Sequence, residues 1–106
     1  KYLKFADPLV PMVLDHSKYT TWRINDDKDI RLDDVLSLCR KDGSEFARAL
    51  VVRVNVTIFG KLGPADYEGH EAFASEQEMY SAYQRYYGVP VDKNTELKVV
   101  RFSLRS

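Results

Sequence analysis

The sequence has little of several residue types that mark specialised architectures. Its 106 residues include one cysteine, four prolines, five glycines and two histidines. A single cysteine cannot form an internal disulfide, and we expect Cys39 to be a reduced core residue of a cytoplasmic protein. His70 has no second histidine, cysteine or carboxylate at ligand spacing on a shared element, so we expect no metal site.

The sequence also lacks an excess of charge of either sign and any long apolar run. Sixteen Lys and Arg residues balance sixteen Asp and Glu residues, which argues against a protein that binds long nucleic-acid duplexes mainly through their phosphates. Apolar runs such as 9–14 are far shorter than the roughly 20 residues that cross a bilayer. The first residues, 1–5, lack the apolar core and cleavage site of a secretory signal. We therefore expect no membrane association and a cytoplasmic location.

What is present indicates one folded domain over residues 1–106. Hydrophobic residues make up 44% and charged residues 30%, close to globular averages, and no repeat or linker divides the chain. The expected order is strand, helix, strand, strand, strand, helix, strand, over 1–5, 7–16, 19–24, 35–40, 46–59, 75–88 and 96–104. No glycine-rich turn follows a strand, so we expect no dinucleotide and no other cofactor. The pattern favours a small α+β barrel with flanking helices.

Two strands allow more specific expectations. The strand 46–59 has an uninterrupted apolar face that we expect to be buried, formed by Leu50, Val52, Val54, Val56 and Ile58. In the last strand the apolar parity shifts between Val99 and Val100, which predicts a β-bulge there. Tyrosines at helical spacing within 75–88 fit core packing, with a stacking surface for bases as the alternative.

Functional groups concentrate in the segment 16–23, where a helix ends and a strand begins. Strand alternation places Tyr19, Thr21 and Arg23 on one face. Lys18 can turn toward that face only if it lies outside the regular pleat, in the loop before the strand. A hydroxyl, an amine and a guanidinium would then share one site. The alternative interpretation is that these are ordinary strand-end residues.

This segment resembles the signature of the ASCH domain, a PUA-like β-barrel family whose motif runs roughly Gly-x-Lys-x-x-Glu-x-Arg. Lys18 and Arg23 match the Lys and Arg, whereas His16 stands at the Gly and Thr21 at the Glu. The stretch 30–36 looks like the family's recurrent Gly-Asp strand entry, with Asp33 where Gly is usual. The order of the predicted elements matches as well. The resemblance thus covers nearly the whole chain and implies a small PUA-like barrel with flanking helices.

Thr21 together with Lys18 and Arg23 is similar to the pattern of small bacterial ASCH proteins that hydrolyse N4-acetylcytidine. Those enzymes also use a glutamate in the loop before the late helix. Glu71 is the nearest match in this sequence, and Glu68 is a competitor. The resemblance therefore implies that Lys18, Thr21 and Glu71 are catalytic residues.

Hydrolysis of an N-acyl group on a base needs a nucleophile, a proton acceptor and a donor for the leaving nitrogen. Thr21 would attack or position water, and Lys18, with a pKa lowered by burial, would accept the proton. Glu71 would shuttle the proton or orient the lysine. Arg23 would hold a carbonyl or phosphate oxygen. The substrate would be a modified nucleoside.

The residues around these groups are candidates for substrate binding. Tyr19 and Trp22 could stack on a base, and His70 could line the pocket beside Glu71. A second hypothesis is a non-catalytic module for single-stranded RNA, with a cleft rimmed by Lys18, Arg23, Arg53 and Lys61. A structural or protein-binding barrel is the third.

Overall fold

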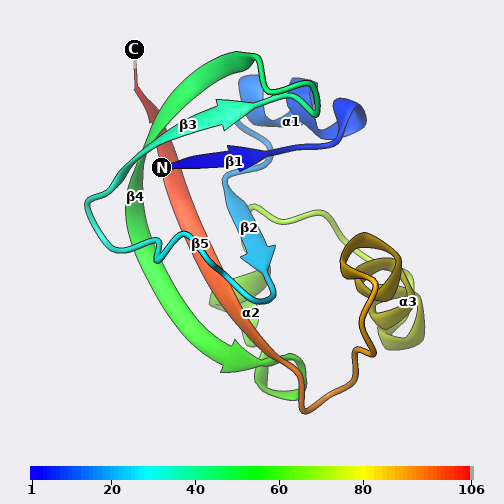
Figure 1. Ribbon diagram of the computed structural model, residues 1–106. Coiled ribbons are helices and arrows are strands. Elements are labelled where there is room, and N and C mark those ends of the chain that lie inside the picture. The colour runs from blue at the N-terminus through cyan, green and yellow to red at the C-terminus, as the bar shows by residue number, and fades with distance from the viewer. Residues whose placement is uncertain (106) are drawn as a thin grey trace.

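A single curled sheet of five strands organises the molecule, as the computed structural model of residues 1–105 shows (Figure 1). The strands are β1 (Tyr2–Lys4), β2 (Thr20–Arg23), β3 (Val35–Cys39), β4 (Glu45–Ile58) and β5 (Glu96–Arg105). The helices are α1 (Val10–Leu14), α2 (Pro64–Tyr67) and α3 (Glu76–Tyr87), with 3-10 turns at Asp7–Leu9 and Phe59–Lys61. The predicted order of elements and the small α+β fold are confirmed.

The strand order β1-β3-β4-β5-β2 leaves β1 and β2 at the two edges of the sheet. β1 pairs with β3 in parallel, and the remaining neighbours pair antiparallel. The long strands β4 and β5 curl the sheet, so that its edges come together as the seam of an open barrel (Figure 1). Arg23 bridges the seam, since its Nη2 donates a hydrogen bond to the Lys4 carbonyl at 3.3 Å.

The caps predicted for the two ends of the late helix are present. The Ser75 hydroxyl accepts a hydrogen bond from the Glu78 amide at 3.1 Å, which caps α3, and Gly88 follows the helix with φ of 67°. No helix within residues 1–105 has the length and apolarity needed to span a bilayer.

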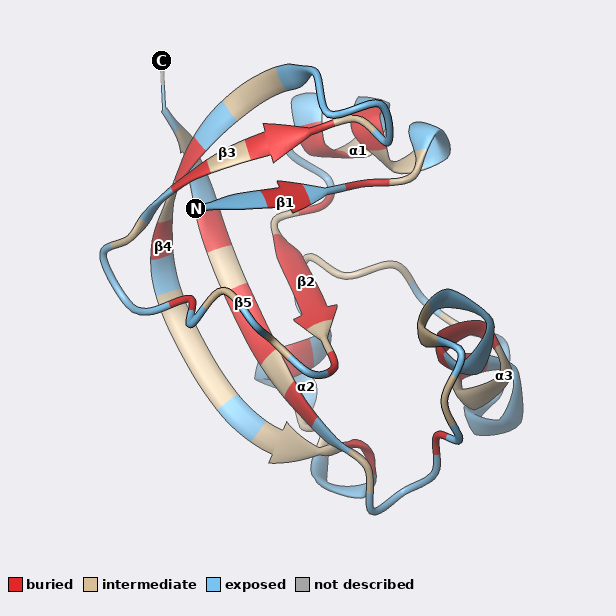
Figure 2. Ribbon diagram, in the orientation of Figure 1, coloured by how far each residue is buried: buried red, intermediate tan, exposed pale blue. Residues whose placement is uncertain are grey.

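Two apolar clusters hold the fold together, one toward each end of the curled sheet. The first joins β1, α1, β3, β4 and β5 and includes Phe5, Val13, Leu38, Val51 and Phe102. The second joins β2, β5 and α3 and includes Trp22, Phe59, Met79, Tyr83 and Leu97. β2 is an edge strand, yet it is buried along most of its length (Figure 2). Segments outside the sheet therefore cover it.

The prediction that one apolar face of β4 is buried along the whole strand is wrong. Val52 is 43% exposed and Val56 is 56% exposed, whereas Ala49 and Val51 are fully buried. The register of β4 against β5 shifts between Val51 and Arg53. This bulge changes the parity of the strand, so no single apolar row faces the core along its whole length.

The bulge predicted in the last strand is likewise misplaced. Val99 and Val100 follow one another in β5 without a register shift, and the irregularity lies on the opposing strand. Both valines are fully buried because Val100 packs in the first cluster and Val99 in the second. The parity shift in the sequence reflects a strand covered on both faces.

Candidate active site

The end of α1 places Lys18 in front of β2. The amides of Ser17 and Lys18 both donate to the Met12 carbonyl at 3.0 Å, which closes the helix in a tight turn. His16 sits in this turn with φ of 68°, and Asp33, the second position where the ASCH pattern has glycine, has φ of 72°. Both residues therefore adopt the left-handed backbone that favours glycine. Lys18 lies outside the regular pleat, as the sequence analysis required.

Lys18 is buried, with a residue exposure of 2%. Its Nζ donates to the Thr20 carbonyl at 2.8 Å and to Glu71 Oε2 at 2.6 Å. Burial lowers the pKa of Lys18, although the negative charge of Glu71 acts in the opposite direction. An amine in this position can exchange a proton with its partner far more readily than an exposed lysine.

A glycine fixes the loop that carries Glu71. The Gly69 carbonyl accepts hydrogen bonds from the amides of Tyr19 at 2.9 Å and Thr20 at 3.0 Å. Gly69 has φ of +75°, and a Cβ there would lie 2.5 Å from the Tyr19 ring. Only glycine permits this close approach, which holds the loop against the start of β2. Glu71 is thereby placed next to Lys18.

The competing glutamate points elsewhere. Glu68 accepts a hydrogen bond from the Tyr19 hydroxyl at 3.1 Å and pairs with Arg101 at 3.2 Å. Tyr19 therefore does not share the face of Thr21 and Arg23, contrary to the sequence-based expectation. It precedes the first residue of β2, so strand alternation does not apply to it.

Thr21 and Arg23 do share a face. Arg23 Nε donates to Thr21 Oγ1 at 3.1 Å, and the Arg23 guanidinium lies 5.1 Å from the centre of the Phe5 ring. Thr21 is 4% exposed. Because its oxygen accepts from a cation, the Thr21 hydroxyl keeps its own proton available for another acceptor, and the nearby positive charge favours an alkoxide.

His70 connects the loop to α3. Its ring stacks on Trp22 with centroids 3.7 Å apart. Nδ1 lies 2.9 Å from the Glu71 carbonyl, which can only accept, so Nδ1 carries the proton. Nε2 then accepts from the Tyr83 hydroxyl at 3.1 Å. This chain of bonds fixes the backbone of Glu71 and hence the direction of its carboxylate.

The ionisation of this cluster follows from burial and from Lys18. Burial, with the positive charge of Lys18 as the second cause, lowers the pKa of His70 to about 4, so the imidazole is neutral at pH 7. Burial acts to raise the pKa of Glu71, but the charge and hydrogen bond of Lys18, together with His70 and a backbone hydrogen bond, outweigh it and the pKa is lowered. Burial raises the pKa of Tyr83 well above 10, which keeps its hydroxyl a donor.

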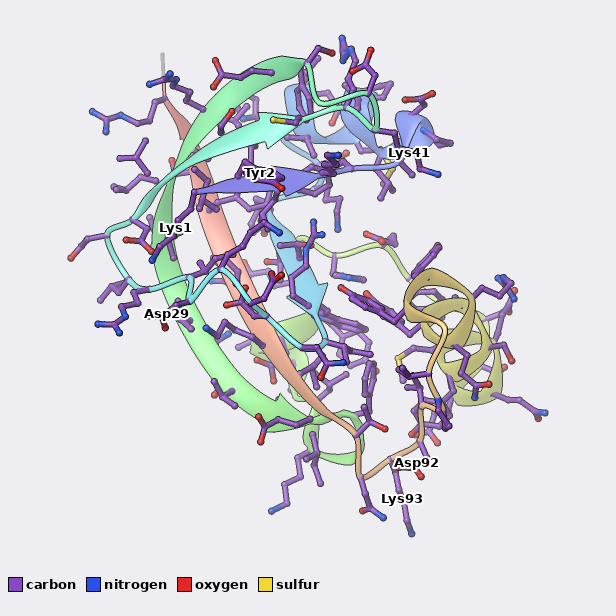
Figure 3. The ribbon with its side chains drawn as sticks, viewed as in Figure 1. Lys1, Tyr2, Asp29, Lys41, Asp92 and Lys93 are labelled. Atoms are coloured by element: carbon purple, nitrogen blue, oxygen red, sulfur yellow. The ribbon has the colours of Figure 1, made fainter. Side chains whose placement is uncertain are left out.

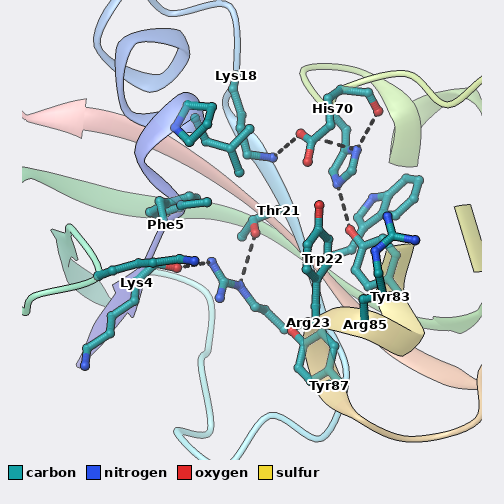
Figure 4. Close-up of a pocket in the computed structure, with 16 residues that line it drawn as sticks. Lys4, Phe5, Lys18, Thr21, Trp22, Arg23, His70, Tyr83, Arg85 and Tyr87 are labelled. Carbon is teal, nitrogen blue, oxygen red and sulfur yellow. Dashed lines mark hydrogen bonds and ion pairs between the residues drawn. The ribbon is translucent and has the colours of Figure 1, made fainter. Parts of the chain in front are cut away.

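These groups open onto one cavity of about 530 Å³ at the seam of the barrel (Figure 4). Six of the residues proposed from the sequence line it: Lys18, Thr21, Trp22, Arg23, His70 and Glu71. The volume lies in the range of small-molecule sites. Trp22 forms part of the cavity wall and supports His70, because its ring stacks on His70 and its Nε1 donates to the Asp66 carbonyl at 3.0 Å.

Three proposed residues lie outside the cavity lining. Arg53 pairs with the buried Asp66 at 3.1 Å. Lys61 belongs to the 3-10 turn after β4, and Tyr19 packs against Gly69. Arg53 and Lys61 do not line this cavity with Lys18, contrary to the expectation, because β2 and β4 are not neighbours in the sheet. Tyr19 instead lines a separate cavity, which Lys18 and His16 also line.

Several residues that line the cavity were not predicted from the sequence, among them Lys4, Lys41, Arg85 and Tyr86. They come from β1, the β3–β4 turn and α3. No motif joins residues so far apart in the chain, so only the closure of the barrel brings them together. Among residues 1–105, no three histidine, cysteine, aspartate or glutamate side chains form a group that could hold a metal ion.

Comparison with known proteins supports the fold. No protein-family model and no curated protein matches the sequence. An ASCH domain of Lactobacillus crispatus JV V101 superposes with a TM-score of 0.66 at 10% identity, over 89% of this chain and 68% of that one. A DUF984 protein of Enterococcus faecalis V583 gives 0.76 at 10% identity, over 92% and 69%. The hypothetical protein PH0355 gives 0.74 at 16% identity, over 98% and 97%. The chain therefore has an ASCH-like fold.

Proposed function

We propose that this protein is an amidohydrolase that removes the acetyl group of N4-acetylcytidine, giving cytidine and acetate. The observation that carries the proposal is the buried Lys18–Glu71 pair, at 2.6 Å, which opens onto the same cavity as the Thr21 hydroxyl. A nucleophile, a proton acceptor and a proton carrier therefore line one space large enough for a nucleoside.

The chemistry proceeds in two steps. Lys18 first passes a proton to Glu71, and its neutral amine then takes the Thr21 hydroxyl proton as Thr21 Oγ attacks the acetyl carbonyl carbon. The bond to N4 breaks, and the Lys18–Glu71 pair delivers the proton to the leaving amine. Water then attacks the acyl-threonine, the pair accepts the water proton, and Thr21 recovers its own as acetate leaves. The pair begins and ends the cycle in the same protonation state.

Arg23 and the backbone of β2 position Thr21 and Lys18 for the reaction. The Arg23 guanidinium contacts Thr21 Oγ1 and would stabilise the negative charge that develops on the attacking oxygen. The Thr20 carbonyl holds Lys18 Nζ on the side opposite its ion pair. Both contacts exist before a substrate binds, so little reorganisation accompanies the reaction.

The alternative, a non-catalytic module for single-stranded RNA, has less geometric support. It relies on a rim that includes Arg53 and Lys61, which lie outside the cavity lining. It also uses Lys18 as a phosphate contact, but Lys18 is buried and paired with Glu71. The hydrolase hypothesis uses Lys18, Thr21 and Glu71, which line the same cavity.

Substitution of Thr21 tests the proposal. Thr21→Val keeps the volume and removes the hydroxyl, and it should reduce turnover of N4-acetylcytidine at least about a hundredfold. Thr21→Ser should retain measurable activity. Thr57→Val, on β4, removes a hydroxyl that does not line the cavity and serves as the matched control. Equal activity of the Thr21→Val and Thr57→Val proteins would refute the assignment of Thr21.

A further inference from the structure

The cavity is much more basic than the protein as a whole. The chain has no net charge, with sixteen residues of each sign. Five cations line the cavity, namely Lys4, Lys18, Arg23, Lys41 and Arg85, and Glu71 is the single carboxylate among its lining residues in the described chain. Because Lys18 neutralises Glu71, four positive charges remain around one opening.

These four cations have no acidic partner within residues 1–105. The ion pairs of the structure involve other lysines and arginines, and none joins Lys4, Arg23, Lys41 or Arg85 to a carboxylate. Four different segments supply them, namely β1, β2, the β3–β4 turn and α3. Cations that converge without counterions create a positive potential that favours an anionic ligand.

Three contacts hold the Arg23 side chain in place. Its Nε donates to Thr21 Oγ1, its Nη2 donates to the Lys4 carbonyl, and its Cζ lies over the Phe5 ring. A guanidinium has five N–H donors, so donors remain for a ligand. Arginine held in this way is well suited to bind the substrate oxygen next to Thr21, which leaves the other three cations for a second anionic group.

Most of the rest of the lining is aromatic or aliphatic, including Phe5, Leu9, Tyr86 and Tyr87. An apolar wall suits the flat base of a nucleoside, and the cationic side chains suit a charged group attached to it. A cavity of about 530 Å³ accommodates one nucleotide.

We propose that the cavity takes a pyrimidine mononucleotide, with the 5′-phosphate bound by Lys4, Lys41 and Arg85, while Arg23 stays at the acetyl end beside Thr21. The inference rests on the proposed function for the identity of the base and names the form in which the substrate arrives. The preferred substrate is then N4-acetylcytidine 5′-monophosphate rather than the free nucleoside.

Binding of the reaction products tests this without turnover. Isothermal titration calorimetry with cytidine 5′-monophosphate and with cytidine should give at least about tenfold tighter binding of the phosphorylated form. Lys41→Gln and Arg85→Gln should each weaken binding of the monophosphate about fivefold and leave cytidine unaffected. Lys93→Gln is the control, since Lys93 is exposed and lies at the other end of the molecule from Lys41 (Figure 3).

Equal affinities for the two ligands, failure of both to bind, or an equal loss in the Lys93→Gln protein would overturn the inference. Tighter binding of a cytidine-rich hexanucleotide without a terminal phosphate would also overturn it, in favour of an RNA strand. Hydrolysis is assayed separately with N4-acetylcytidine, which has no phosphate. If the protein hydrolyses N4-acetylcytidine but binds cytidine 5′-monophosphate no tighter than cytidine, only this inference is refuted. If it binds the monophosphate more tightly but does not hydrolyse N4-acetylcytidine, only the hydrolase is refuted.

Discussion

Replacement of Lys18 by methionine separates the chemistry of this lysine from its packing. The side chain is 2% exposed and fills the space between β2 and the Glu71 loop. Methionine has a similar length and no charge, so it fills that space without an amine. Alanine would instead leave a cavity in the wall, which by itself costs about 2–5 kcal/mol of stability.

The stability change can be worked from the contacts. Lys18→Met removes two charge-assisted hydrogen bonds, to Thr20 and Glu71, each of which contributes about 1.5–3 kcal/mol. It also removes the desolvation penalty of a buried ammonium, which is several kcal/mol. The Glu71 side chain is 24% exposed and can be hydrated once it is unpaired. We therefore expect the free energy of unfolding to change by less than about 2 kcal/mol.

Glu71→Gln should behave differently, because it leaves the more deeply buried charge without a counterion. We expect a loss of about 3 kcal/mol of stability. The attraction of Glu71 raises the pKa of Lys18, so its removal lowers that pKa further. The folded variant then regains stability as the pH rises through the lowered pKa of Lys18 toward its unfolded value.

Urea unfolding and turnover of N4-acetylcytidine measure the two effects side by side. Both single variants should lose at least about a hundredfold in turnover, and the double variant should be no worse than the worse single variant. A folded Lys18→Met protein with turnover within tenfold of the parent protein would refute the proton-transfer role. Additive losses in the double variant would refute the claim that the pair acts as a unit.

Three further predictions concern stability and reactivity. Because the pKa of His70 is lowered to about 4, its contribution to the free energy of unfolding is fully present above pH 6.5 and falls by about 3 kcal/mol toward pH 4. Urea unfolding at both pH values should therefore show a smaller loss in the His70→Gln protein than in the parent protein. Gly69→Ala should destabilise the protein more than Gly43→Ala, because a Cβ at Gly69 would meet Tyr19. Gly43 also has positive φ but has nothing within 4 Å, so equal shifts of the two melting temperatures would contradict this. Cys39, which is 5% exposed, should react slowly with thiol reagents in the native protein, and labelling as fast as in urea would contradict its burial.

Local signals predicted much of this structure. The caps of α3, the order of the elements and the place of Lys18 outside the pleat depend on neighbouring residues, and those were correct. His16 and Asp33, which stand where the ASCH pattern has glycine, both have a left-handed backbone in this chain. A histidine and an aspartate tolerate that conformation better than β-branched residues do.

Features that depend on which segments meet could not be predicted in the same way. The parity of β4 depends on a bulge opposite Phe102, which its own alternation does not reveal. Arg53 and Arg23 are both basic strand residues, but they lie on strands separated by β5, so they do not share a site. Lys41 and Arg85 reach the cavity only because the barrel closes at its seam.

Incubation of the protein with N4-acetylcytidine at neutral pH, followed by chromatography, is the decisive assay for the proposed hydrolase. We expect equal amounts of cytidine and acetate, many turnovers for each protein molecule, and loss of turnover in the Lys18→Met protein. If folded parent protein released no cytidine, or if that variant kept its turnover, the protein would not be this hydrolase.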